Sequence, residues 1–433
     1  MISRRHFVHA GLGVGAGAVL SSFLASCAGV AGGGSSGGGK ELQVAWWGGN
    51  DRAKRTQDVI DLFKKSDSSV KVSGQFSAWA GYWQKLDTEA AGGGLPDVIQ
   101  MDMGYIGQYT KRQQCLDLTQ MGDATLDLAD FDKNQLAQGK VDGKLYGISL
   151  GGNIDAAFYN TTALTTAGAK VPADDTTWDG FASWCSKIAK SLPSGMYPAD
   201  DPSGSTPPFE VWVRQRHDEM WTADGKLGYT VDDVKDWFTY WAELRKAKLI
   251  VPGTVAAEAL QNGTNQGAPL VTEKAASSMT WSNFLGQYQI LTKNELAMGR
   301  LPLGDQPGDY VKASQLWSAS AKTEQTDTVA AFIKFFLHDE AAIKVLGLER
   351  GVPASAKARE LLKPDLESYD KAQIDFFDTT SPKTRAKKVL EPATASDVGA
   401  AFTRAAQSIS LTNKTPAEAA MTYMDEAQKA LGA

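Results

Sequence analysis

Hydrophobic positions after residue 41 follow two alternating periods, one typical of strands and one typical of helices. The apolar stripe Val59, Ile60, Leu62 and Phe63 has helical spacing, and Asn50 or Asp51 is the natural cap before it. The predicted elements are a strand at 42–46, a helix at 50–65, a strand at 70–76, a helix carrying Trp79, Trp83 and Leu86 on one face, and a buried strand at 96–102. This order predicts a parallel sheet with helices on both faces, and ligands of such sheets bind at the carboxyl ends of the strands.

The pattern continues with strands and an increasing share of helix. We expect a hairpin with an Asp-Gly turn at 141–149, a flexible crossing at 151–153, strands at 155–159, 275–281 and 312–320, a helix at 328–337, and a final helix opened by a capping box at Thr415. Trp237 and Trp241 share a helical stripe with Leu244, which predicts core packing, as we also expect for Trp178 and Trp184. The proline- and glycine-rich stretch 193–208 is either a lid or a plain surface loop.

Residues 1–39 do not carry the pattern of a fold. Ser3-Arg4-Arg5-His6-Phe7-Val8 matches a twin-arginine export signal, and an apolar run too short for a membrane span follows it. Leu24-Ala25-Ser26-Cys27 resembles a bacterial lipobox, which predicts a signal peptide at 1–27 and lipidation of Cys27. A plain anchor or chance is the alternative. Residues 28–40 are rich in Gly, Ser and Ala, and we expect them to form a tether of roughly 20 Å.

Composition limits the function classes. The chain has 433 residues, a length that predicts two domains. Its net charge of −6 argues against nucleic-acid binding. Beyond the signal region only His217 and His338 occur, without zinc spacing or a nucleophile motif. A disulfide between Cys115 and Cys185 is allowed but not required. The chain also contains 12 tryptophans, all of which follow the signal region.

The tryptophan pair in "AWWGGN" raises a packing problem, because adjacent strand residues point to opposite faces. Trp46 shares its face with Leu42 and Val44 and is the better candidate for the core. Trp47 is then the better candidate for a ligand platform, although the sequence does not decide between the two indoles.

Several segments in order resemble the extracellular solute-binding proteins (family 1) of ABC transporters, of the carbohydrate-binding type. They are "FKKSDSSVKV", "LPDVIQMDMGYIGQY", "GKVDGKLYGISLGGNIDAAFYNTTAL", "TTWDGFASW" and "LGLERGVPAS". "WWGGND", "WAGYWQKL" and "VIQMD" look most like the group that binds oligogalacturonides. The resemblance covers roughly residues 42 to 430.

The resemblance implies a two-lobed α/β fold of the type II periplasmic-binding-protein kind, with the sugar between the lobes. Lobe one would comprise 41–150 plus 318–351, and lobe two 155–313 plus 354–433, with hinges near 151–155, 313–318 and 351–354. It also implies that the lobes close by hinge bending on a mono- or oligosaccharide and that the closed form docks on an ABC permease. We further expect a monomer with no cofactor, metal or catalysis. The lipid anchor would hold it at the outer face of the cytoplasmic membrane.

A sugar site needs flat aromatic rings for C–H faces and polar groups for hydroxyls. The candidate ligand-binding residues are Trp46, Trp47, Asn50, Asp51, Trp79, Asp102, Asn153, Trp281, Trp317 and Arg350. The alternatives are core packing for each tryptophan, a helix cap for Asp102, a turn for Asn153 and a surface ion pair for Arg350. An acidic ligand would call on Arg350, Arg52 and the amino end of the helix near Asn50.

Other classes compete with this interpretation. A glycoside hydrolase or lyase needs two carboxylates across a cleft, and no second partner for Asp97 or Asp102 is identifiable. A scaffold without a small ligand, and a binder of peptides or polyamines, are further alternatives. Polyamines would require an acidic cage, whereas tryptophan-rich strand ends favour sugars.

Overall fold

The computed structural model describes residues 41–432 apart from 263–264, 388, 390 and 393, so the signal, lipobox and tether predictions lie outside the described residues. Its strands are β1 (Glu41–Trp47), β2 (Lys71–Ser77), β3 (Val98–Met101), β4 (Lys140–Val141), β5 (Lys144–Leu145), β6 (Ile148–Asn153), β7 (Asp155–Asn160), β8 (Ser277–Trp281), β9 (Leu296–Arg300) and β10 (Lys312–Ala319). The α-helices are α1 (Asn50–Ser66), α2 (Trp79–Gly92), α3 (Met103–Lys111), α4 (Asp123–Leu126), α5 (Lys133–Ala137), α6 (Thr161–Thr166), α7 (Trp178–Ile188), α8 (Thr206–Arg214), α9 (Val231–Lys246), α10 (Gly253–Asn262), α11 (Phe284–Gln289), α12 (Thr326–His338), α13 (Glu340–Leu346), α14 (Ala356–Leu362), α15 (Ser368–Thr380), α16 (Ala395–Thr412) and α17 (Pro416–Ala430).

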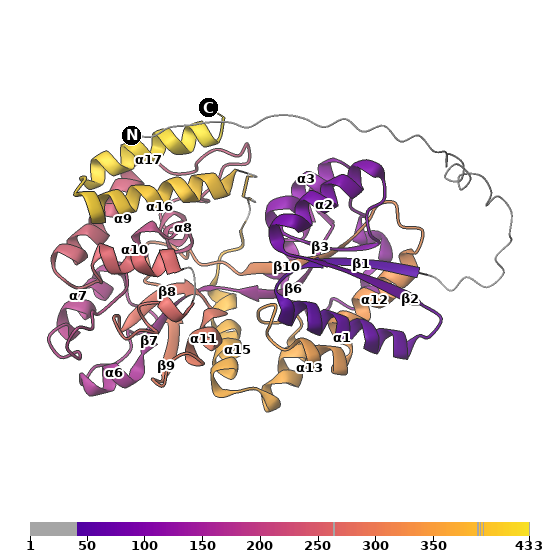
Figure 1. Ribbon diagram of the computed structural model, residues 1–433, viewed down its shortest axis with the longest axis horizontal. Coiled ribbons are helices and arrows are strands. Elements are labelled where there is room, and N and C mark those ends of the chain that lie inside the picture. The colour runs from indigo at the N-terminus through magenta and orange to yellow at the C-terminus, as the bar shows by residue number, and fades with distance from the viewer. Residues whose placement is uncertain (1–40, 263–264, 388, 390, 393, 433) are drawn as a thin grey trace, which may run out of the picture. The chain divides into compact units, whose positions relative to one another are not determined.

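The first lobe is a five-stranded sheet with helices on both faces (Figure 1). Its strand order is β2-β1-β3-β10-β6, in which β1 runs parallel to β2 and β3 whereas β10 runs antiparallel to β3 and β6. Helices α1, α12 and α13 contribute apolar side chains to the core on one face, and α2 and α3 to the core on the other. The predicted parallel β-α-β-α-β unit is confirmed.

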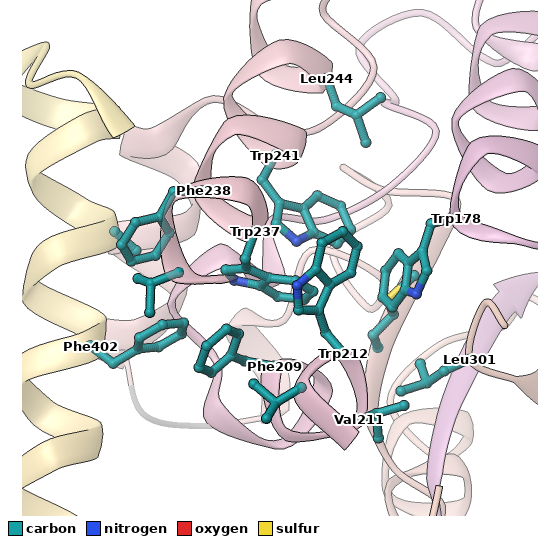
Figure 2. Packing of buried hydrophobic residues seen from close by; sticks show 14 of the residues in the cluster. Trp178, Phe209, Val211, Trp212, Trp237, Phe238, Trp241, Leu244, Leu301 and Phe402 are labelled. Carbon is teal, nitrogen blue, oxygen red and sulfur yellow. The ribbon is translucent and has the colours of Figure 1, made fainter. Parts of the chain in front are cut away.

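The second lobe is built on the antiparallel sheet β8-β7-β9. One face is covered by the large core of α7, α8, α9, α16 and α17, and the other by α11 and α15. Figure 2 shows Trp178, Trp212, Trp237 and Trp241 gathered in the large core with Phe209 and Phe402. Core packing of Trp178, Trp237 and Trp241 is therefore confirmed, and Trp184 packs against the same core.

Three segments of the chain run side by side at the ends of β6 and β10 that lead toward the second sheet. The amide of Gly152 donates to Val352 O (2.8 Å) and the amide of Val352 donates to Gly152 O (3.0 Å), while Lys312 is the register partner of Asn153. A Cβ on Gly151 would lie 2.3 Å from the carbonyl oxygen of Arg350. Gly151 is thus needed for close backbone approach within β6, a different role from the flexible crossing that the sequence suggested.

Several sequence predictions need correction. Gly49, with no side-chain hydrogen bond, is the N-cap of α1, so the cap assigned to Asn50 or Asp51 is wrong. Helix α14 packs against α13 through Ala358, Leu362 and Ile343, on the first-lobe side of the expected boundary at 354. Cys115 and Cys185 are free and lie in different cores.

The remaining local predictions agree with the structure. Asp142 and Gly143 both have positive φ, as the tight turn between β4 and β5 requires, and Thr415 forms the expected capping box of α17. In the described part of the chain, every helix is too short or too polar to span a membrane.

Candidate functional site

The carboxyl ends of β1, β2 and β3 meet at one edge of the first sheet because the three strands are parallel. Helices α1, α2 and α3 begin within three residues of these ends, and aromatic and polar residues therefore gather there. This edge is where open α/β sheets place their ligands.

The tryptophan pair divides between the two faces of the sheet, as strand alternation predicts. Trp46 is 2% exposed in the core with Leu42 and Val44, whereas Trp47 is 6% exposed in the core on the opposite face. Trp47 contacts the rings of Trp79, Tyr82 and Trp83 at centroid distances of 5.0, 5.2 and 5.4 Å. Both indoles are thus covered by protein, and Trp47 supports the ring that lies above it.

That outer ring is Trp79, the first residue of α2, which is 45% exposed. It packs edge-on against Trp47 and against Trp83, the latter at 5.4 Å. Tyr105 on α3 stacks on Trp83 with a centroid distance of 3.6 Å and lies edge-on to Trp79 at 6.0 Å. The neighbouring rings hold an exposed indole in place, which is what a stacking platform requires.

Asp102 lies between β3 and α3 and caps the helix, accepting a hydrogen bond from the amide of Gly104 at 2.8 Å. Burial raises the pKa of this carboxyl, while the Gly104 hydrogen bond and the positive charge of Lys312 act in the opposite direction. The helix-cap alternative is therefore realised in the structure. One carboxylate oxygen caps the helix, and the carboxylate retains further acceptor capacity for a ligand hydroxyl.

The second lobe presents Trp281, the last residue of β8, whose register partner is Asp155 at the start of β7. The half-buried indole lies edge-on to Tyr310 at 6.0 Å, and the ammonium group of Lys312 lies 5.2 Å from its ring centroid. A cation over an indole restrains the ring as well as stabilising it. Trp281 is thus a second indole held at the end of a strand.

The charges beside Trp281 are paired with one another. Lys312 lies 3.7 Å from Glu391, and Lys387 lies 3.2 Å from Glu391 and 2.8 Å from Glu210. Although burial acts in the opposite direction, Lys312 and Lys387 lower the pKa of Glu391 to about 2. Glu391 is therefore an ionised acceptor that holds both lysines.

Asp155 is a buried carboxyl in the same region. Burial and the nearby Glu210 raise its pKa well above the ordinary value, against the pull of Lys312. Neither of its carboxyl oxygens has a hydrogen-bond partner among the described residues. Burial thus favours the protonated form of this carboxyl, and a protonated carboxyl can donate as well as accept a hydrogen bond.

Asp51, at the start of α1, is paired with Arg55 at 2.8 Å and lines a cavity of about 680 Å³. Asn283 and Gln287 from the region of α11 line the same cavity, as does Arg52, which is itself paired with Glu349 at 2.7 Å. Asn50 is exposed beside Asp51. Asp51 therefore faces a cavity whose described lining includes none of the rings around Trp79.

Three other predicted site residues are buried in the protein or lie at the end of a strand. Trp317 is fully buried and packs edge-on against Phe336 of α12 at 5.2 Å. Arg350 is 4% exposed and donates to Thr56 Oγ1 at 2.8 Å, and burial lowers its pKa to about 9. Asn153 ends β6, and its Oδ1 is buried without a partner among the described residues.

Sequence reasoning missed several residues at these strand ends, chiefly Tyr105, Tyr310, Lys312 and Glu391. Tyr105 lies one helical turn after Asp102 in "MDMGYIGQY", so helix spacing alone could have found it. Lys312 begins a strand that the sequence did predict. Glu391 is brought to Lys312 only by the tertiary fold, and no local signal marks it.

Comparisons with known proteins agree with this architecture. Residues 59–373 match the family model of the bacterial extracellular solute-binding proteins. An extracellular solute-binding protein family 1 structure from Alicyclobacillus acidocaldarius is 29% identical with a TM-score of 0.80, covering 92% of this chain and 100% of that one. A periplasmic oligogalacturonide-binding protein from Yersinia enterocolitica has the same fold at 23% identity and a TM-score of 0.73, covering 90% and 100% of the two chains.

Among curated proteins, the arabinooligosaccharide-binding protein of Bacillus subtilis is 25% identical over 227 residues. The match covers 51% of this chain and 50% of the relative, so the chain spans about half the length of the curated relative it matches. Because the family model covers most of the described chain, this protein belongs to the bacterial extracellular solute-binding protein family.

Proposed function

We propose that the protein captures an oligosaccharide at the strand ends of its two lobes and delivers it to the permease of an ABC importer. The observation that carries the proposal is a pair of indoles at strand ends, Trp79 and Trp281, each held by neighbouring groups. Carboxyls stand at neighbouring strand ends, Asp102 after β3 and Asp155 opposite Trp281. Indoles stack on the C–H face of a sugar ring while carboxyls take its hydroxyls. The arabinooligosaccharide- and oligogalacturonide-binding proteins that resemble this chain support a sugar ligand.

Hinge bending at the three side-by-side connections would bring the two indoles onto one ligand. The hydrogen bonds between Gly152 and Val352, and the bond from Ser314 Oγ to Arg350 O, tie the connections into a single ribbon. The lobes can then rotate about this ribbon while each keeps its own core. These contacts support hinges near 151–155 and 313–318, although Trp317 itself lies within the first-lobe core. Because α14 packs on α13 of the first lobe, the third hinge would follow α14 and would not lie at 351–354.

The protein would act at the cell envelope. Export by the twin-arginine route and lipidation of Cys27 would hold it at the outer face of the cytoplasmic membrane, as a monomer on its tether of residues 28–40. Globomycin treatment of the producing cells tests the anchor, because it blocks cleavage at a lipobox. Accumulation of the uncleaved chain supports the anchor, and unchanged processing contradicts it.

A thermal-shift screen of residues 28–433 against mono- and oligosaccharides tests the proposed function. A ligand at 100 times its dissociation constant stabilises the folded state by about 2.7 kcal/mol through mass action. A screen in which no sugar shifts the unfolding temperature would contradict sugar binding. Release of shortened sugars from an oligosaccharide would show catalysis in place of binding.

A further inference from the structure

The second lobe contains a cavity of about 480 Å³ beside β8. Its walls include Ser278, Met279 and Thr280, the three residues that lead directly into Trp281. The opposite wall is formed by the start of α8 and by Ala256 and Ala259 of α10. The volume falls within the range of small-molecule sites, and the strand that lines the cavity ends at Trp281, one of the two proposed stacking indoles.

The wall at residues 202–204 is fixed by the large core behind it. Trp237 Nε1 donates to Ser203 O at 2.8 Å, and Thr403 Oγ1 donates to Gly204 O at 2.9 Å. A short ion pair joins Arg245 to Asp201 at the same place. The stretch 193–208, which the sequence left as a lid or a surface loop, is therefore held as a cavity wall over this part. A wall that is already ordered loses little conformational freedom when a ligand binds.

The charges of the lining favour a neutral ligand. The described lining residues include the carboxyls of Asp200 and Asp201 and no Lys, Arg or His. Asp201 is balanced by Arg245, whereas Asp200 accepts a hydrogen bond from Ser278 Oγ and has no partner for Oδ1 among the described residues. Burial raises the pKa of Asp200 to about 7, and Asp201 adds to the rise against the Ser278 bond. A free acceptor suits a hydroxyl and disfavours a second carboxylate.

The amino end of α8 does not compensate for this acidity. Helix starts bind anions through free backbone N–H groups. Pro207 and Pro208 occupy the second and third positions of α8, and proline has no N–H to donate. The helix therefore offers fewer donors to an anion than an ordinary helix start.

The basic residues that an acidic ligand would call on are engaged elsewhere. Arg52 is paired with Glu349 at 2.7 Å, and Arg350 is buried against Glu349 and Thr56. Lys312 is paired with Glu391 and lies over the Trp281 ring. A uronate at these positions would have to break an existing ion pair.

Resting on the proposed function, we propose that this cavity is a subsite for a neutral, hydroxyl-rich sugar unit next to Trp281, so that the protein selects neutral oligosaccharides over uronates. One end of the ligand occupies the cavity, and the chain continues past Trp281 toward Trp79. Affinity then rises with chain length until the cavity is filled.

Calorimetric titration with arabinobiose, arabinotetraose, digalacturonic acid and tetragalacturonic acid tests this. We expect the tetraose to bind wild type about tenfold more tightly than the biose, and each galacturonate at least about tenfold more weakly than the neutral sugar of equal length. Ala259→Trp fills the cavity, so the affinity of this variant for the tetraose should fall to its affinity for the biose. The control variant Thr254→Trp lies at an exposed position of the same helix, outside the cavity lining, and should leave the affinities for both sugars unchanged.

Thr280→Val keeps the shape of the wall and removes only a hydroxyl, so it covers the case in which Ala259→Trp does not fold. It should weaken the tetraose about threefold or more and leave the biose unchanged. Galacturonates that bind as well as the neutral sugars would overturn the inference and leave sugar binding intact. The inference would also be overturned if both cavity variants still bound the tetraose more tightly than the biose by the wild-type factor. Absence of binding by all four probes would instead remove the proposed function, and the inference with it.

Discussion

The two lobes each gather aromatic rings, but they use them differently. In the second lobe Trp178, Trp212, Trp237 and Trp241 contact one another at centroid distances of 5.2 to 6.2 Å, and all are buried (Figure 2). In the first lobe Trp47 and Trp83 are equally buried, but Trp79 projects from the cluster with 45% of its surface exposed. A platform for a ligand is therefore distinguished by one exposed ring that buried rings support, and not by aromatic content.

The largest expected effect is a loss of stability on removal of a tryptophan from the buried cluster of the second lobe. Replacing Trp237 with Ala should lower the free energy of unfolding by about 3–5 kcal/mol, because it opens a cavity in the core and removes the hydrogen bond to Ser203 O. Urea unfolding followed by circular dichroism measures this. Trp237→Phe, which keeps a ring, should cost less, and equal losses would contradict the packing account.

The buried carboxyl beside the second cluster should show its burial as a pH dependence. The pKa of Asp200 is raised to about 7 in the folded protein, so the folded state binds more protons than the unfolded state between about pH 4 and 7. Wild type should therefore lose stability relative to Asp200→Asn as the pH rises through this window, by about 1 kcal/mol per pH unit. Parallel stability curves for the two proteins from pH 4.5 to 8 would contradict the raised pKa.

The exposed ring of the first cluster should affect binding more than folding. Trp79→Ala should weaken binding of a neutral oligosaccharide about tenfold while costing about 1 kcal/mol or less in unfolding free energy. Trp79→Phe should retain most of the affinity, because a flat ring remains. Calorimetric titration and urea unfolding of the same preparations measure both quantities, and a stability loss like that of Trp237→Ala would assign Trp79 to the core.

The smallest expected effect concerns the group that restrains the second indole. Lys312→Gln removes the cation over Trp281 and one of the two lysines held by Glu391, so we expect about threefold weaker sugar binding. The fold should be unaffected, since Lys387 still pairs with Glu391. An unchanged affinity would mean that Trp281 needs no restraint from Lys312.

The local periodicity of hydrophobic residues predicted most of the strands and helices of the fold. The strands β1, β2, β3, β8 and β10 and the helices α1 and α12 all appear within two residues of their predicted bounds, because each has a strong apolar pattern. Helix α2 also contains the predicted Trp79, Trp83 and Leu86. The cap of α1 was predicted wrongly because a glycine with suitable backbone geometry precedes the polar residues. The packing of α14 on α13 depends on tertiary contacts that no local pattern encodes.

The sequence predicted the general location of the candidate site but not the burial or pairing of its individual residues. Strand ends pointed to Trp79, Asp102 and Trp281, which the structure places at or just after strand ends, and their role in binding stays a prediction. Strand alternation correctly separated Trp46 from Trp47. Burial could not be read from the same pattern, so Trp317 and Arg350 were chosen for their positions although the fold encloses them. Lys312 and Glu391 meet across 79 positions of sequence, which is why their ion pair required the structure.

The most direct test of the central claim is calorimetric titration of arabinotetraose into wild type and into the double variant Trp79→Ala/Trp281→Ala. We predict that wild type binds and that the double variant loses about 100-fold in affinity, with its unfolding temperature lowered by only a few degrees. Equal affinity of the two proteins would contradict a sugar held by the two strand-end indoles.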